Sequence, residues 1–136
     1  MDAFDFVVAG IPASAQKKGP NNRWQDRVRK AARTRWPRGA PPITEELSAT
    51  IVYFYVDETN LDVDNIPKAI LDALVNVVYT DDALVSQVLV RKTKLEPGLA
   101  IRNPPPELAQ AMATARGDFV YVRFSSAPIH SEVPRW

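Results

Sequence analysis

The segment Ser48–Val56 (SATIVYFYV) restricts the fold of this chain more than any other part of the sequence. It is rich in β-branched and aromatic residues, which favour strands, and near its end it is apolar on both faces. A strand of this kind lies inside a sheet that is covered on both sides. The sequence therefore predicts a central strand at 48–56 in a layered domain.

Three further strand-like segments and three helical segments surround this central strand. The strands are predicted at 5–11, 84–94 and 118–124, and the helices at 22–36, 66–76 and 107–116. Strands interleaved with helices indicate a single small α/β (α+β) domain with helices packed on a mixed β-sheet. We expect this domain to cover residues 1–124 and residues 125–136 to form a flexible tail.

The chain has 136 residues, of which 46% are hydrophobic and none is cysteine. This length supports a core without disulfides or a structural zinc ion. The lack of cysteine excludes a disulfide framework, a thiol nucleophile and cysteine-ligated metals, and it fits a reducing compartment. The longest apolar runs are shorter than the roughly 18 residues that a membrane span needs. We therefore expect a cytoplasmic protein with no membrane partner.

The net charge of +1 hides a strong asymmetry. Residues 17–38 contain nine bases and one acid, whereas the rest of the chain contains eight bases and fifteen acids. Seven of those acids lie within residues 57–82. The pattern fits an enzyme that holds a polyanion and acts on it with a metal ion. It also fits a solvated basic helix beside an unrelated acidic surface, and charge alone leaves both interpretations open.

The acidic segment begins with Asp62-Val63-Asp64-Asn65, followed by Lys68 and Asp72. In an extended segment, residues i and i+2 point the same way, so Asp62 and Asp64 are expected to present two carboxylates to one point. In the helix that follows, positions 64, 68 and 72 share one face. Lys68 is thus expected beside the carboxylates.

Asp81 and Asp82 follow one short helix and a turn later, where we expect the chain to return to the start of that helix. Three or four oxygen ligands without cysteine favour Mg²⁺, with Mn²⁺ as the alternative, over zinc. Each part also has a purely structural interpretation: a helix cap at Asp64–Asn65, a turn at Asp81–Asp82, and an i,i+4 ion pair between Lys68 and Asp72. Their convergence around one lysine favours a site.

The ordered pattern Asp62-Val63-Asp64-Asn65, Lys68, Asp72-Ala73-Leu74 and Asp81-Asp82 resembles the D-x-D-N-x-x-K-x-x-x-D-A-L…D-D signature of RusA-type Holliday junction resolvases. Residues 57–90 carry the resemblance most strongly. It implies a small mixed α/β fold and a homodimer that cuts branched DNA symmetrically with Mg²⁺. By position, it implies metal-binding catalytic aspartates at Asp62, Asp64 and Asp82, a further or alternative ligand at Asp81, a functionally important lysine at Lys68, and supporting positions at Asn65 and Asp72.

The basic segment is expected to bind DNA phosphates without reading sequence. Its proposed DNA-binding residues are Lys17, Lys18, Arg23, Arg27, Lys30 and Arg33. Trp24 lies on the apolar stripe of the same helix, so it is expected in the core rather than stacked on an unpaired base. Two other functions remain open: a branched-DNA-binding module without catalysis, and a Mg²⁺-dependent hydrolase of small phosphates.

Overall fold

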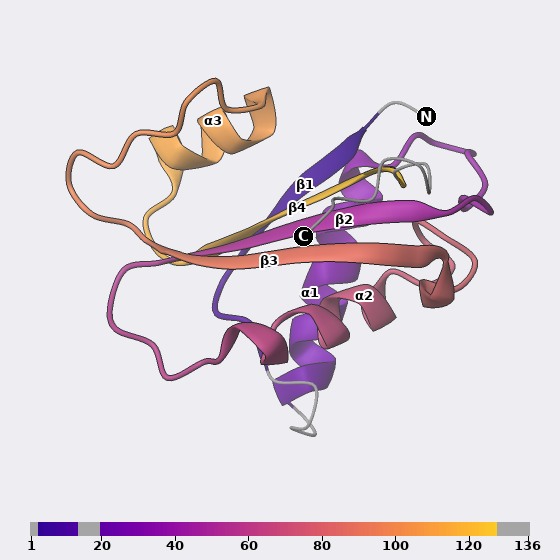
Figure 1. Ribbon diagram of the computed structural model, residues 1–136, viewed down its shortest axis with the longest axis horizontal. Coiled ribbons are helices and arrows are strands. Elements are labelled where there is room, and N and C mark those ends of the chain that lie inside the picture. The colour runs from indigo at the N-terminus through magenta and orange to yellow at the C-terminus, as the bar shows by residue number, and fades with distance from the viewer. Residues whose placement is uncertain (1–2, 14–19, 128–136) are drawn as a thin grey trace, which may run out of the picture.

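A mixed four-stranded sheet forms the centre of the molecule (Figure 1). The computed structural model describes residues 3–13 and 20–127. The strands are β1 (Phe4–Ala9), β2 (Leu47–Tyr55), β3 (Val85–Lys94) and β4 (Phe119–Ser126). They lie in the order β1-β4-β2-β3, with β4 antiparallel to both of its neighbours and β3 parallel to β2. The predicted mixed sheet is confirmed.

Helices cover both faces of this sheet. They are α1 (Pro20–Arg35), α2 (Pro67–Ala73) and α3 (Pro106–Thr114). Two 3₁₀ turns flank α2 in the sequence: η1 (Val63–Asn65) precedes it and η2 (Asp82–Leu84) follows it. Figure 1 shows α1 and α2 on one face and α3 on the other. Among the described residues, no helix combines the length and the apolar character needed to cross a membrane.

Each face of the sheet has its own apolar core. The larger core lies between the sheet and the α1–α2 layer, and the smaller one lies under α3. Trp24 is 4% exposed and belongs to the larger core, which confirms its predicted place on the buried stripe of the helix. The core prediction for the central strand is also confirmed, because Ile51, Tyr53 and Phe54 are all buried.

The observed element boundaries differ from the predicted ones by at most three residues, as the ends of β1, α2 and β4 illustrate. β1 ends at Ala9 because Gly10 turns the chain with a φ of +120°, a conformation that side-chain-bearing residues avoid. α2 ends at Ala73, since Asn76 has a φ of +66° and its N–H bonds the Tyr79 carbonyl at 2.7 Å. β4 continues to Ser126, so the first two residues of the predicted tail belong to the sheet. Residues 128–136 lie outside the described residues.

The connection from β2 through α2 to β3 determines where the acidic residues lie. Because β3 is parallel to β2, with Leu47 beside Val85 and Tyr55 beside Lys94, the chain must cross back along the sheet between them. The segment at 56–66 therefore lies at the end of the sheet where β2 finishes. The segment at 74–84 lies at the opposite end, where both strands begin.

Candidate active site

A cavity of about 610 Å³ opens where the end of β1 meets the start of α1 and the segment that leads into α2. It brings together parts of the chain that are some fifty residues apart in the sequence. Its lining residues are Ile11, Pro12, Ala13, Arg23, Trp24, Arg27, Asn60, Leu61, Asp62 and Asn65. Two predicted DNA-binding residues, Arg23 and Arg27, therefore line the same cavity as Asp62 and Asn65 of the predicted acidic motif.

Arg27 is held at this cavity by the backbone of β1. Its Nη1 donates a hydrogen bond to the carbonyl oxygen of Ala9 at 3.2 Å. A Cβ atom on Gly10 would lie 2.3 Å from that Nη1, so only glycine allows the guanidinium to occupy this place. Arg27 remains exposed, which leaves its other N–H groups available for an anion.

Asp62 and Asp64 precede α2, but they are not in the extended segment that was predicted. Asp62 is extended, with φ −74° and ψ 146°, whereas residues 63–65 form the turn η1. The two carboxylates therefore do not share a face through strand alternation. Neither acts as a cap, because α2 has Ile66 at its N-cap and no side-chain capping bond. Both are exposed and make no hydrogen bond or ion pair with any described residue.

Two lysine side chains from β3 bind the loop that precedes Asp62 in the sequence. Lys92 Nζ donates to the Leu61 carbonyl at 2.9 Å, and Lys94 Nζ pairs with Glu58 Oε1 at 2.9 Å. This ion pair lowers the pKa of Glu58 and raises that of Lys94. Sequence reasoning missed both lysines. The signal was the alternation of β3, which puts positions 88, 90, 92 and 94 on the face that carries α2.

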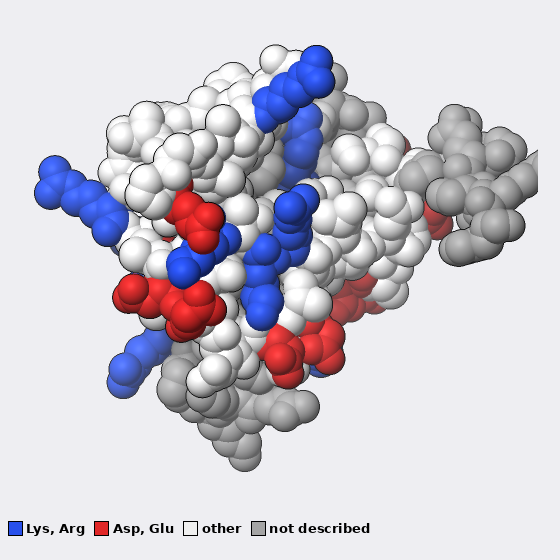
Figure 2. Space-filling view, turned by 60° about the vertical axis from the view of Figure 1, so that its left-hand side comes forward, with Lys and Arg blue, Asp and Glu red and all other residues white. Residues whose placement is uncertain are grey.

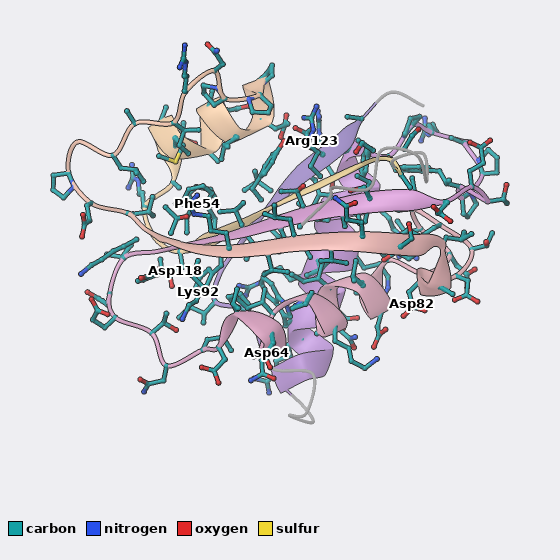
Figure 3. All side chains as sticks on the ribbon, viewed as in Figure 1. Phe54, Asp64, Asp82, Lys92, Asp118 and Arg123 are labelled. Carbon is teal, nitrogen blue, oxygen red and sulfur yellow. The ribbon has the colours of Figure 1, made fainter. Side chains whose placement is uncertain are left out.

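Asp118 anchors the other end of the same loop. Its Oδ2 accepts a hydrogen bond from Tyr53 Oη at 2.5 Å, and its Oδ1 accepts one from the Val56 N–H at 2.9 Å. Burial and, next, the hydrogen bond to Asp118 raise the pKa of Tyr53 well above its usual range. Figure 3 shows Asp118 and Lys92 near the end of the sheet from which this loop leaves.

Lys68 and Asp72 form an i,i+4 ion pair on α2, as expected if the two residues have a purely structural role. Lys68 Nζ lies 3.3 Å from Asp72 Oδ2, and the lysine side chain is 70% exposed. An exposed pair of this kind contributes little to stability. Lys68 therefore keeps enough freedom to turn toward another anion. Both residues lie on α2, after the acidic turn η1.

Asp81 and Asp82 lie at the far end of α2. Asp81 Oδ1 accepts the Ala83 N–H at 2.9 Å and so caps η2, which is the turn expected from the structural interpretation. Asp82 begins η2 just before β3. Figure 3 shows Asp64 and Asp82 at opposite ends of α2. The expectation that the chain returns to the start of this helix is wrong, because the parallel crossover carries it to the other end of the sheet.

The predicted group of four aspartates is therefore not assembled within one chain. In the described part of the molecule, no three histidine, aspartate or glutamate side chains lie close enough together to hold a metal ion. The structure brings Asp62 and Asn65 into the cavity and separates them from Asp81 and Asp82.

The bases of α1 divide into two groups. Arg23, Arg27, Lys30 and Arg33 are exposed, and the last two border a second hollow further along the helix. Arg29, by contrast, is engaged in the fold, donating from Nε to the Ala73 carbonyl at 3.2 Å. Lys17 and Lys18 lie outside the described residues. Figure 2, which faces the loops after β2 and β3, shows basic and acidic side chains side by side rather than one uniformly basic patch.

One cavity thus contains the carboxylate of Asp62, which pairs with no described residue, and two exposed arginines, groups that can bind a divalent metal ion and phosphate oxygens. Residues 13–102 match the sequence model of the family described as endodeoxyribonuclease RusA, which covers more than half of the chain. The chain therefore belongs to the RusA family of endodeoxyribonucleases. A comparison with curated protein sequences finds no significant match.

Proposed function

We propose that this protein is a Mg²⁺-dependent endonuclease that resolves four-way DNA junctions by hydrolysing two phosphodiester bonds symmetrically. In this proposal it acts as a homodimer in the cytoplasm, in DNA recombination and repair. The observation that carries the proposal is the cavity where Asp62 and Asn65 lie beside Arg23 and Arg27. Membership of the RusA family supports DNA as the substrate.

The carboxylates that precede the N-terminus of α2 are suitable ligands for a divalent cation such as Mg²⁺. Asp62 and Asp64 provide two exposed carboxylates that no described residue neutralises. Mg²⁺ is commonly held by one or two carboxylates, with substrate phosphate oxygens and water in the remaining positions. When bound, the cation would polarise the scissile phosphate and lower the pKa of the attacking water.

The other residues of the cavity bind and orient the DNA. Arg23 and Arg27 offer guanidinium groups that match phosphate oxygens in pairs. Lys68 lies on α2 close to the acidic turn, and when it leaves Asp72 its ammonium group can neutralise charge that develops on the reacting phosphate. We therefore expect Lys68→Ala to slow cleavage more than it weakens junction binding.

Asp82 has a place in this site only if a second copy supplies it. Within one chain it follows α2, whereas Asp62 and Asp64 precede that helix, and Figure 3 shows Asp64 and Asp82 at its opposite ends. In a homodimer, Asp82 of one copy can approach the acidic turn of the other. Two copies would also present two sites to two opposed strands, as symmetric cleavage requires.

A labelled four-way junction tests the activity directly. We expect paired nicks on opposite strands in Mg²⁺ and none in EDTA at equal ionic strength, with linear duplex left intact. Asp62→Asn should abolish cleavage and keep junction binding, because removing a negative charge does not weaken attachment to a polyanion. Glu45→Gln is the matched control, since Glu45 is exposed and lies before β2, away from the cavity. Junction binding without metal-dependent cutting would favour the non-catalytic module.

A mixing experiment tests whether the site is shared. One protein carries Asp62→Asn and Asp64→Asn, and the other carries Asp82→Asn, so each alone should be inactive. If the sites are shared, a mixed dimer has one intact site and single nicks return. Mixing Asp62→Asn with Asp64→Asn is the control and should restore nothing, because both positions lie on the same turn. The absence of rescue in the first mixture would confine each site to one chain.

If the protein neither binds nor cuts junctions, a Mg²⁺-dependent hydrolase of small phosphates becomes the better interpretation. Its activity would not depend on the basic helix. Arg27→Gln would then leave hydrolysis of a nucleotide substrate unchanged, whereas it should weaken junction binding in the nuclease.

A further inference from the structure

The two edges of the sheet differ in how well they are protected. β1, at one edge, is six residues long, packs against both α1 and α3, and carries the nearly buried charge of Asp5. Short edges, covering helices and inward-pointing charges all prevent pairing with another chain. β3, at the other edge, is ten residues long, or about 33 Å. Among the described residues it pairs only with β2, so its outer backbone groups have no strand beside them.

The middle of β3 is apolar and exposed. Val88 is 40% exposed and Leu89 is 54% exposed, and these neighbours point to opposite faces of the sheet. The strand contains no proline or glycine, and its first six residues carry no charge. Its only irregularity is near its start, where the register shifts beside Leu47 and Ser48. A long, regular edge with these properties is suited to pairing with another strand.

Charge along β3 identifies the partner. Asp81 and Asp82 precede the strand, whereas Arg91, Lys92 and Lys94 occupy its second half. Lys94 already pairs with Glu58 and Lys92 with a carbonyl, but Arg91 is exposed and has no partner among the described residues. A strand that is acidic at one end and basic at the other is complementary to itself when a second copy runs antiparallel.

We propose that β3 pairs antiparallel with β3 of a second copy, about a two-fold axis near Val88 and Leu89. The two four-stranded sheets then form one continuous sheet. A two-fold axis requires both copies to use the same surface, and an edge strand meets this requirement. The inference rests on the homodimer of the proposed function and names its interface. In this arrangement, Asp82 of one copy lies at the basic end of the other's β3, which is also the end of the sheet that carries Asp62.

Association in solution tests the interface without reference to nuclease activity. Leu89→Lys places two like charges near the axis, and we expect it to raise the dimer dissociation constant about tenfold or more in analytical ultracentrifugation. Ala109→Lys is the matched control, because Ala109 is exposed on α3 and the substitution adds the same charge there. Both proteins should keep wild-type circular dichroism, since neither position is buried within the single chain.

Cross-linking gives a second and positive readout, because the chain contains no cysteine. A Leu89→Cys or Val88→Cys protein should be joined to its copy by a short bismaleimide, whereas an Ala109→Cys protein should not. A monomeric wild-type protein would overturn the inference, and so would a dimer that Leu89→Lys leaves intact and these cysteines fail to join. The two proposals fail separately. A β3-linked dimer that does not cut DNA refutes the nuclease alone, and a nuclease whose dimer ignores β3 refutes the interface alone.

Discussion

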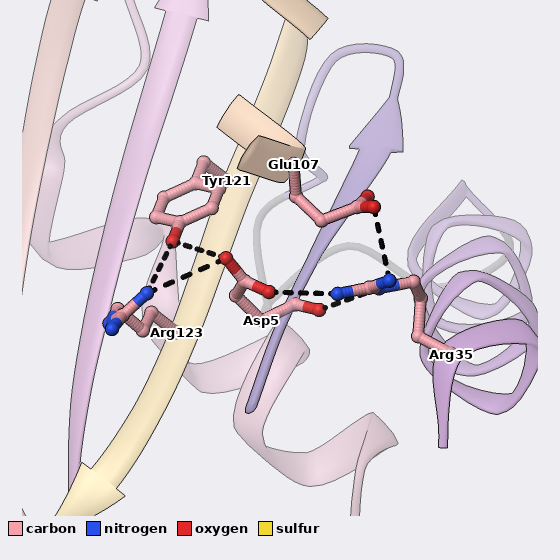
Figure 4. A network of polar contacts seen from close by, with 5 residues as sticks. All are labelled: Asp5, Arg35, Glu107, Tyr121 and Arg123. Carbon is pink, nitrogen blue, oxygen red and sulfur yellow. Dashed lines mark hydrogen bonds and ion pairs between the residues drawn. The ribbon is translucent and has the colours of Figure 1, made fainter. Parts of the chain in front are cut away.

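Asp5→Asn tests whether a nearly buried carboxylate fastens α1 to the sheet. Asp5 lies on β1 and is 8% exposed. Its Oδ1 accepts a hydrogen bond from Arg35 Nη2 at 3.0 Å, and its Oδ2 accepts one from Tyr121 Oη at 2.7 Å (Figure 4). Arg123 Nη1 lies 3.6 Å from the same Oδ2. Two arginines and one hydroxyl group therefore converge on one carboxylate.

The size of the effect follows from these contacts. A hydrogen bond to a charged group contributes roughly 1.5–3 kcal/mol, and breaking a fully buried ion pair costs about 3–5 kcal/mol. The side chains of Arg35 and Arg123 are 42% and 39% exposed, so water compensates part of the loss. We expect a cost of about 2 kcal/mol. At about 2.1 cal/mol/K per residue over 136 residues, this cost lowers the melting temperature by about 7 °C.

Urea and thermal unfolding followed by circular dichroism measure this change. Glu107→Gln is the matched control, because Glu107 contacts the same Arg35 guanidinium at 3.1 Å but is itself 26% exposed. It should cost less than about 1 kcal/mol. The reasoning is refuted if Asp5→Asn costs less than about 0.5 kcal/mol, or no more than Glu107→Gln.

Three further predictions concern single side chains. Arg27→Gln should reduce the slope of log K against log salt for DNA binding by about one unit, the value for one lost phosphate contact. Gly10→Ala should give the same reduced slope, because its Cβ displaces Arg27 Nη1, and positive-φ strain should also cost about 1–3 kcal/mol in urea unfolding. Burial and, next, the hydrogen bond to Asp5 raise the pKa of Tyr121 to about 12. In the unfolded chain a tyrosine ionises near pH ~10. The contribution of Tyr121 to stability should therefore be complete below pH ~10 and be lost as the pH rises toward about 12. Urea unfolding across this range should show a smaller alkaline loss for Tyr121→Phe than for the wild type.

Local signals in the sequence were enough to find the four strands and three α-helices of the described residues. The β-branched run at 48–56 and the apolar stripe around Trp24 predicted β2 and α1, because burial of one face determines both patterns. Pro67 was expected in the first turn of a helix, and α2 begins there. Pairing between strands depends on residues far apart in the sequence, so the order β1-β4-β2-β3 was outside the reach of periodicity.

The charge pattern of α1 predicted a basic helix, but it did not tell which of its bases are free to bind an anion. Arg29 and Arg35 look like their neighbours in the sequence, yet the first donates to the Ala73 carbonyl at the end of α2 and the second joins the Asp5 network. Which bases remain free depends on what packs against the helix. Among the described bases of α1, Arg23, Arg27, Lys30 and Arg33 are exposed and pair with no described carboxylate, so they are left to bind an anion.

The position of Asp82 shows how topology changes the meaning of a motif. The signature places one acidic pair before a short helix and the other after it, and nothing in the spacing tells whether the helix connects antiparallel or parallel strands. Because β2 and β3 are parallel, the helix must cross the sheet, and the two acidic pairs are carried to its opposite ends. In the proposed function, a motif split in this way forms one metal site between two copies. The proposed dimer and its proposed interface at β3 both derive from one feature of the fold, the parallel crossover that leaves β3 at the edge of the sheet.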